Sequence, residues 1–169
     1  MKKSTTVFIT YNPDSEAEQR LAVRLHSIGA VNGFRMFLPE RYFSETVLDN
    51  ETKRRIEDSD YYVVFSLGKL SQIVQQEIEY AFNHLRDKSR IIVIYDAKKG
   101  ENLSGQMTNL FHPFDFDPVK DSVDDLVAQV LTHIAQQQAK KQETDKAFAT
   151  LLGIGLGLWA LSSLSESRK

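Results

Sequence analysis

Short runs of consecutive apolar residues alternate along the chain with longer segments whose apolar residues recur every three or four positions. The short runs are "TVFIT" (6–10), "FRMFL" (34–38), "YYVVFS" (61–66) and "RIIVIY" (90–95). They are rich in β-branched and aromatic residues and predict four strands. Continuous apolar runs are typical of strands covered on both faces, as in parallel sheets. "FHPFDF" (111–116) predicts a further strand at the edge of the sheet.

The segments between the strands predict helices. After the first strand, Asn12 is the expected cap and Pro13 the expected first helical residue. The helix should end at "GAVNG" (29–33), because glycine and asparagine favour helix ends. Its buried stripe is expected to consist of Ala17, Leu21, Leu25 and Ile28.

Three more helices follow the same logic. A short one is expected over 47–58 and a second one from Ser71 onwards. A long amphipathic helix should run from Ser122, capped together with Asp125, to Gln138. Its predicted buried stripe is Val123, Leu126, Val127, Val130 and Ile134.

Strands and helices alternate throughout, which predicts a doubly wound α/β fold with a mostly parallel sheet of about five strands. Ligands of such sheets bind beyond the carboxyl ends of the strands. We therefore expect residues 10–14, 38–46 and 66–72 to surround one crevice.

Composition narrows the classes of function. The 169 residues are 41% hydrophobic and 26% charged, which fits one globular domain with a tail. The net charge is −2 and the basic residues are scattered, which argues against a nucleic-acid partner. There is no cysteine, so disulfides and thiol chemistry are excluded, and the four histidines fall at no metal-ligand spacing, so no metal site is expected. "MKKSTTVFITY" lacks the apolar run of a signal peptide, so a cytoplasmic protein is expected.

The C-terminal part has a different character. Residues 147–164, "AFATLLGIGLGLWALSSL", contain no charge and predict an apolar helix, whereas 1–138 form the α/β domain, 139–146 a polar linker or helix extension, and 165–169 a short tail. As a helix the apolar segment would span about 27 Å, close to a hydrocarbon core of about 30 Å. Ala149, Gly153 and Gly157 form a small-residue face suited to helix pairing. A membrane anchor, an oligomerisation helix and an extra helix packed on protein all remain open.

Two carboxylates in "SQIVQQEIEYA" (71–81) differ in their expected surroundings. Successive helical residues are about 100° apart, so with Val74 at 0° the apolar face is centred near Ile78. Glu79 then lies about 140° away and points to water, while Glu77 lies at about −60°, at the edge of the apolar stripe. Glu77 is therefore the candidate for chemistry.

The stretch from "VFITY" through "FLPER" to "YYVVFSLGKLSQIVQQEIEYA" resembles the Toll/interleukin-1 receptor (TIR) domain over roughly residues 5–135. Phe8, Thr10 and Tyr11 match the end of the family's first strand, with threonine in place of serine. Further on, a pattern of Ser, Trp, Cys, Glu and Leu is matched in spacing by Ser71, Ile73, Val74, Glu77 and Ile78, so that Ile73 and Val74 replace Trp and Cys. The resemblance implies a flavodoxin-like arrangement of the sheet.

The resemblance also implies a function. Many bacterial and plant TIR domains cleave the nicotinamide–ribose bond of NAD with a helix glutamate that corresponds to Glu77, and some do so in anti-phage defence. NAD would then be a substrate, with no cofactor, and activity would depend on self-association through the domain and the 147–164 helix. The candidate substrate-binding residues are Thr10, Tyr11, Asn12, Phe37, Pro39, Arg41, Ser66 and Ser71. Arg41 is a candidate partner of the diphosphate; the simpler interpretations are that Phe37 belongs to the core and that Arg41 is a solvated charge.

Two alternatives remain open at this point. "GFRMFLPER" and "QEIEYA" also resemble nucleoside 2-deoxyribosyltransferases, although the acidic, glycine-containing turn of those enzymes is replaced here by "SLGKLSQ". Other TIR domains are adaptors without catalysis, and many of these lack the glutamate. In both enzymatic interpretations, Glu77 takes part in cleaving an N-glycosidic bond.

Overall fold

The computed structural model of the chain describes residues 4–40, 46–96, 98 and 112–141. It divides into two compact units, Met1–Asp121 and Ser122–Lys169. The first unit contains the sheet with three α-helices, and the second contains one long helix among its described residues.

The sheet of the first unit has five parallel strands in the order β2-β1-β3-β4-β5. They are β1 (Thr6–Thr10), β2 (Arg35–Phe37), β3 (Tyr61–Ser66), β4 (Ile91–Tyr95) and β5 (His112–Asp115). The predicted number of strands is confirmed, and the sheet is entirely parallel. This order is the flavodoxin-like one, in which the direction of strand addition reverses between β1 and β3.

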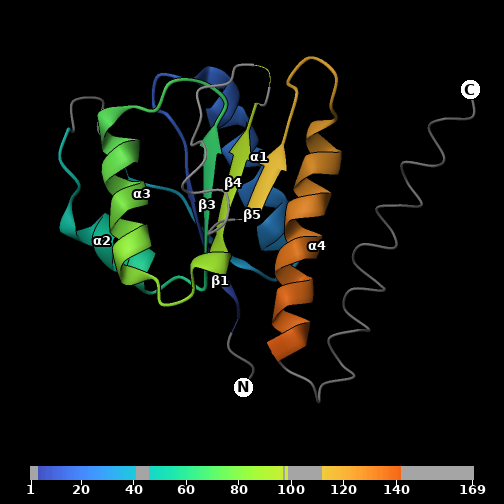
Figure 1. The fold of residues 1–169 in the computed structure, drawn as a ribbon. Coiled ribbons are helices and arrows are strands. Elements are labelled where there is room, and N and C mark those ends of the chain that lie inside the picture. The colour runs from blue at the N-terminus through green and yellow to red at the C-terminus, as the bar shows by residue number, and fades with distance from the viewer. Residues whose placement is uncertain (1–3, 41–45, 97, 99–111, 142–169) are drawn as a thin grey trace, which may run out of the picture. The chain divides into compact units, whose positions relative to one another are not determined.

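Helices cover both faces of this sheet (Figure 1). The helix α1 (Glu16–Val31) contacts β1, β2 and β3 from one face, while α2 (Asn50–Glu57) and α3 (Gln72–His84) pack side by side on the other. A short 3-10 helix, Lys88–Arg90, leads into β4. After α1 the chain turns at Gly33, whose φ of 84° lies in the left-handed region that glycine adopts without strain.

A buried apolar cluster lies beneath α2 and α3 and shows which side chains of the strands point toward these helices. It joins Phe8 of β1 to Tyr62 and Val64 of β3, and to Ile73, Val74, Ile78 and Ala81 of α3. Side chains alternate along a strand, so Thr10 of β1 and Ser66 of β3 point to the same face as this cluster.

The start of α1 differs from the prediction. Asn12 is not the cap and Pro13 is not helical, since the N-cap is Ser15, in an extended conformation, and its hydroxyl accepts a hydrogen bond from the Glu18 N–H at 3.3 Å. The polar groups of Asn12 bond elsewhere, and a serine three residues before an acid is itself a strong start signal. The second predicted helix is also shorter than expected, because Asp49 caps α2 and it begins only at Asn50.

The second unit is described from Ser122 to Lys141 and contains α4 (Val123–Lys141). The predicted cap is confirmed, since the Ser122 hydroxyl accepts from the Asp125 N–H at 3.3 Å. Four of the five predicted stripe residues are buried, while Val123 is 37% exposed because it stands in the first turn. Within the described parts of the chain, no helix is long and apolar enough to cross a membrane. The predicted helix over 147–164, with Ala149, Gly153 and Gly157, lies outside the described residues.

Candidate functional site

Glu77 and Thr10 meet at the carboxyl end of β1. The Glu77 side chain comes from the sheet-facing side of α3, one turn after Ile73, and the residue is 1% exposed. Thr10 is the last residue of β1 and is fully buried, and its hydroxyl donates a hydrogen bond to Glu77 Oε2. A carboxylate is thus fixed at the point in the sheet where strand order reverses, which is where ligands of this fold bind.

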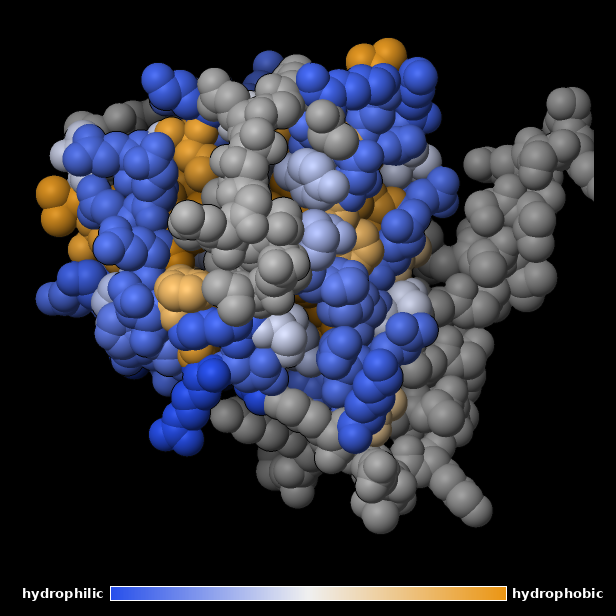
Figure 2. Space-filling view, in the orientation of Figure 1, coloured by the Kyte–Doolittle hydropathy of each residue, from blue (hydrophilic) through white to orange (hydrophobic). Residues whose placement is uncertain are grey.

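Glu79 shows the opposite behaviour. It lies in the same helix two residues on and is exposed, as the helical spacing predicts. Figure 2 shows mainly hydrophilic side chains over the outer side of α3, where Gln72, Gln75 and Asn83 are also exposed. The distinction between the two glutamates is confirmed.

A second buried carboxylate, Glu18, was not among the predicted site residues. It is 0% exposed, although it stands in the first turn of α1. Its Oε1 accepts from the Leu67 N–H at 2.8 Å and from Asn12 Nδ2 at 3.0 Å. Its Oε2 accepts from the Asn12 N–H at 2.7 Å and from Asn12 Nδ2 at 2.8 Å. Burial raises the pKa of the Glu18 carboxyl, and these N–H donors offset only part of that effect.

Asn12 continues this set of contacts to α3. Its Oδ1 accepts from the backbone N–H of Ser71, the N-cap of α3, at 2.7 Å. We call Glu18, Asn12, Leu67 and Ser71 the Glu18 network. It connects the loops after β1 and β3, so two of the three segments expected around one crevice, 10–14 and 66–72, are in contact. The Ser71 Oγ is buried and makes no hydrogen bond within the described part of the chain.

The segment before α2 is held against α3 by Gln76. Its Oε1 accepts from the Leu48 N–H at 3.1 Å, and its Nε2 donates to the Thr46 carbonyl at 2.8 Å. Gln76 precedes Glu77 directly, so the residue next to the candidate carboxylate fixes the chain entering α2.

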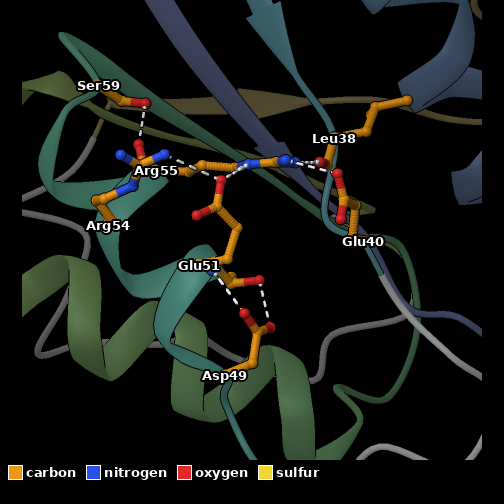
Figure 3. A network of polar contacts seen from close by, with 8 residues as sticks. Leu38, Glu40, Asp49, Glu51, Arg54, Arg55 and Ser59 are labelled. Carbon is orange, nitrogen blue, oxygen red and sulfur yellow. Dashed lines mark hydrogen bonds and ion pairs between the residues drawn. The ribbon is translucent and has the colours of Figure 1, made fainter.

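Arg55 of α2 holds the segment that follows β2 (Figure 3). Its guanidinium contacts Glu40 at 2.5 Å, Glu51 at 2.9 Å and the Leu38 carbonyl at 3.4 Å. The same group lies over the Phe37 ring, 5.6 Å from its centroid. Glu51 also forms an ion pair with Arg54 at 3.3 Å, so its carboxylate contacts two arginines.

The remaining predicted site residues fall into three groups. Phe37 is partly buried and packs against the cluster beneath α2 and α3, next to Phe8 in register, and Pro39 is buried. Tyr11 is half-buried directly after Thr10, and Ser66 is buried at the end of β3. Arg41 lies outside the described residues.

The arrangement offers a fixed, water-poor carboxylate with a hydroxyl donor beside it. Such a group can stabilise a developing positive charge or hold sugar hydroxyls. In the described part of the chain, no three acidic or histidine side chains gather to hold a metal ion. No protein-family model matches the chain, and no curated protein is detectably similar to it.

Proposed function

We propose that this protein cleaves the N-glycosidic bond between nicotinamide and ribose in NAD, with Glu77 as the catalytic carboxylate. One observation carries the proposal: Glu77 is buried beside Thr10 at the carboxyl ends of β1 and β3. A surface acid of a helix would be solvated, as Glu79 is. Burying a carboxylate is costly and needs compensating hydrogen bonds, so a buried one at a ligand-binding edge is a candidate for chemistry.

The chemistry suits a single carboxylate. When the C1′–N bond breaks, the pyridinium nitrogen takes the electron pair and leaves as neutral nicotinamide. The ribose then carries oxocarbenium-like positive charge, which an ionised carboxylate stabilises more strongly than it stabilises the ground state. Water supplies the oxygen that bonds to C1′ and releases one proton, so ADP-ribose is the hydrolysis product; attack by a group within NAD would give a cyclic isomer instead.

The resemblance to TIR domains supplies the rest of the proposal. Tyr11 would line the nucleotide side, and Phe37 and Pro39 would shape the opposite side, with Arg41 near the diphosphate. Activity would require self-association, and the protein would act in bacterial defence by consuming NAD or by making a signal from it. The place of action would be the cytoplasm, with the 147–164 segment as the candidate membrane contact.

The decisive experiment follows nicotinamide release by HPLC from NAD mixed with concentrated full chain. Glu77→Gln keeps the size of the side chain and removes its charge, so release should fall at least a hundredfold. Glu79→Gln is the matched control in the same helix and should leave the rate unchanged. Full activity in Glu77→Gln would overturn the assignment.

The same samples separate the alternatives. A nucleoside 2-deoxyribosyltransferase would exchange bases between deoxynucleosides and leave NAD intact. An adaptor would do neither, and its signalling in cells would survive Glu77→Gln.

A further inference from the structure

We infer that Glu18 is a positioning residue for Glu77, acting through Asn12 and the first turn of α3. The inference rests on the proposed function, because it takes Glu77 as the reacting carboxylate. It assigns a role to an acid that is remote from Glu77 in sequence and makes no contact with substrate.

The bonding of Glu18 excludes a direct chemical role. Each of its two oxygens accepts from two protein N–H groups, and the residue is 0% exposed. A carboxylate oxygen offers about two lone-pair directions, so both oxygens are occupied by the protein itself. Glu18 therefore cannot reach a substrate without breaking the Glu18 network.

The network fixes two loops at once. Glu18 accepts hydrogen bonds from the Asn12 N–H after β1 and from the Leu67 N–H after β3, so one carboxyl group contacts both loops. Asn12 connects these loops to α3, because its Oδ1 accepts a hydrogen bond from the Ser71 N–H at 2.7 Å. Ser71 is the N-cap of α3, and its own hydroxyl makes no capping bond, so Asn12 supplies the side-chain contact at this helix start.

Glu77 lies six residues after Ser71 in the same helix, less than two turns away. A helix is rigid over that length, so a shift or rotation of its first turn moves the Glu77 carboxylate relative to Thr10. A catalytic group displaced by about 1 Å loses on the order of a hundredfold in rate. Glu18 is thus placed to control the Thr10–Glu77 contact from the opposite face of the sheet.

The sequence around Glu18 would suggest a different use. Ser15 and Glu18 form the serine-x-x-glutamate pattern of a capping box, in which the acid turns back to the N-cap N–H. Half of the box is present, since Ser15 accepts from the Glu18 N–H. The Glu18 side chain instead extends to Asn12 and Leu67. Its carboxylate therefore accepts hydrogen bonds from the two loops and not from the N-terminus of its own helix.

The test compares Glu18→Gln with Glu16→Gln. Glu16 stands in the same helical turn, but its side chain is 80% exposed and pairs with the exposed Arg20. The amide that Glu18→Gln introduces turns an N–H toward N–H donors, so the local opening of Leu67 and Ser71 should rise about tenfold to a hundredfold. Amide hydrogen exchange measures this directly, and the amides of β4 serve as the reference for global unfolding.

Two further readouts address Glu77 itself. The methyl resonance of Thr10 reports the Thr10–Glu77 contact with or without activity, and it should shift in Glu18→Gln but not in Glu16→Gln. In NAD cleavage, kcat should fall about tenfold or more, while KM changes little, because a misplaced carboxylate weakens the transition state more than the bound substrate. The double variant Glu18→Gln with Asn12→Asp exchanges the amide and the carboxylate and should recover part of kcat.

The outcomes are distinct. If Leu67 and Ser71 exchange as in the parent, or if they open faster while the Thr10 methyl and kcat are unchanged, the positioning role is wrong. If Glu18→Gln does not fold, the double variant decides: a folded double variant with the parent's Thr10 shift and part of the parent's kcat supports the role, and one with neither overturns it. If the parent protein does not cleave NAD, the proposed function fails, and the Thr10 methyl shift still decides whether Glu18 positions Glu77.

Discussion

The hydroxyl of Thr10 donates a hydrogen bond to the carboxylate of Glu77, across 67 residues of sequence. Thr10 ends β1 and Glu77 lies in α3, so the contact joins the sheet to the helix that covers it. Both residues are buried, so the hydrogen bond between them is shielded from water and stronger than the same bond at the surface. The contact fixes where the carboxylate points.

Thr10→Val tests this contact, because valine keeps the branched shape and removes the hydroxyl. Glu77 would lose a donor in a buried site, which should cost about 1–3 kcal/mol of stability. Nicotinamide release should fall about tenfold to a hundredfold, since the carboxylate loses the hydroxyl contact that orients it from the sheet. Thr10→Ser retains the donor and should stay within about threefold of the parent. Equal activity in the valine and serine variants would show that the hydrogen bond has no part in catalysis.

Arg55→Ala should destabilise the protein more than Arg54→Ala. The Arg55 side chain is only 19% exposed and joins Glu40, Glu51 and the Leu38 carbonyl, whereas that of Arg54 is 68% exposed and contacts Glu51 among the described residues. Exposed ion pairs contribute little, so most of the loss comes from the packing of Arg55 on Phe37. We expect about 1–2 kcal/mol for Arg55→Ala and less than about 0.5 kcal/mol for Arg54→Ala, from urea denaturation. Equal losses would mean that Arg55 acts only as a surface charge.

The apolar segment 147–164 carries a prediction from sequence alone, since it lies outside the described residues. Leucine at Gly153 and Gly157 would separate helices that pair through small residues. The double substitution should reduce both the oligomer fraction in sedimentation and the turnover of NAD in the full chain. Unchanged size distributions and unchanged turnover would exclude pairing through this face.

The strands and the Glu77–Glu79 distinction could be predicted because each depends on local periodicity. Short continuous apolar runs rich in β-branched and aromatic residues, such as 61–66, are typical of a strand covered on both faces, and a helix places residues two apart on different sides. These patterns survive in the structure because burial of the same side chains drives both the local element and its packing.

The role of Glu18 could not be predicted in the same way. Its partners are Asn12, Leu67 and, through Asn12, Ser71, which come together only when β1 and β3 are neighbours. The local signal, serine followed three residues later by glutamate, predicts a capping box, and tertiary contacts override half of it. The same holds for Phe37, whose surroundings depend on Arg55 from a different element.

Asp49 gives a pH-dependent prediction for α2. Its Oδ1 accepts from the Thr52 N–H at 2.8 Å and its Oδ2 from the Thr52 hydroxyl at 2.6 Å, so it caps the helix with both oxygens. Partial burial raises the pKa of the Asp49 carboxyl, but the hydrogen bonds from Thr52 outweigh it and hold the pKa below the ordinary value of 3.8. A carboxyl whose pKa is lowered by folding stabilises the folded state fully above its unfolded pKa. That contribution is lost as the pH falls through the folded pKa.

Asp49→Ala should therefore lower the free energy of unfolding by about 1 kcal/mol at pH 7, the usual cost of losing such a cap. The penalty should shrink as the pH is lowered from 5 to about 3, because protonation then weakens the cap of the parent as well. Asp49→Asn keeps an acceptor oxygen and should lower the free energy of unfolding by less than Asp49→Ala does at pH 7. Its side chain does not titrate, so its own contribution as a cap should not change between pH 5 and pH 3. Asp58→Ala, at the exposed C-terminal end of the same helix, is the control and should cost nothing at either pH, since an acid there opposes the helix dipole. Urea denaturation at each pH measures all four proteins, and a penalty for Asp49→Ala that stays constant down to pH 3 would show that the cap does not depend on the charge of Asp49.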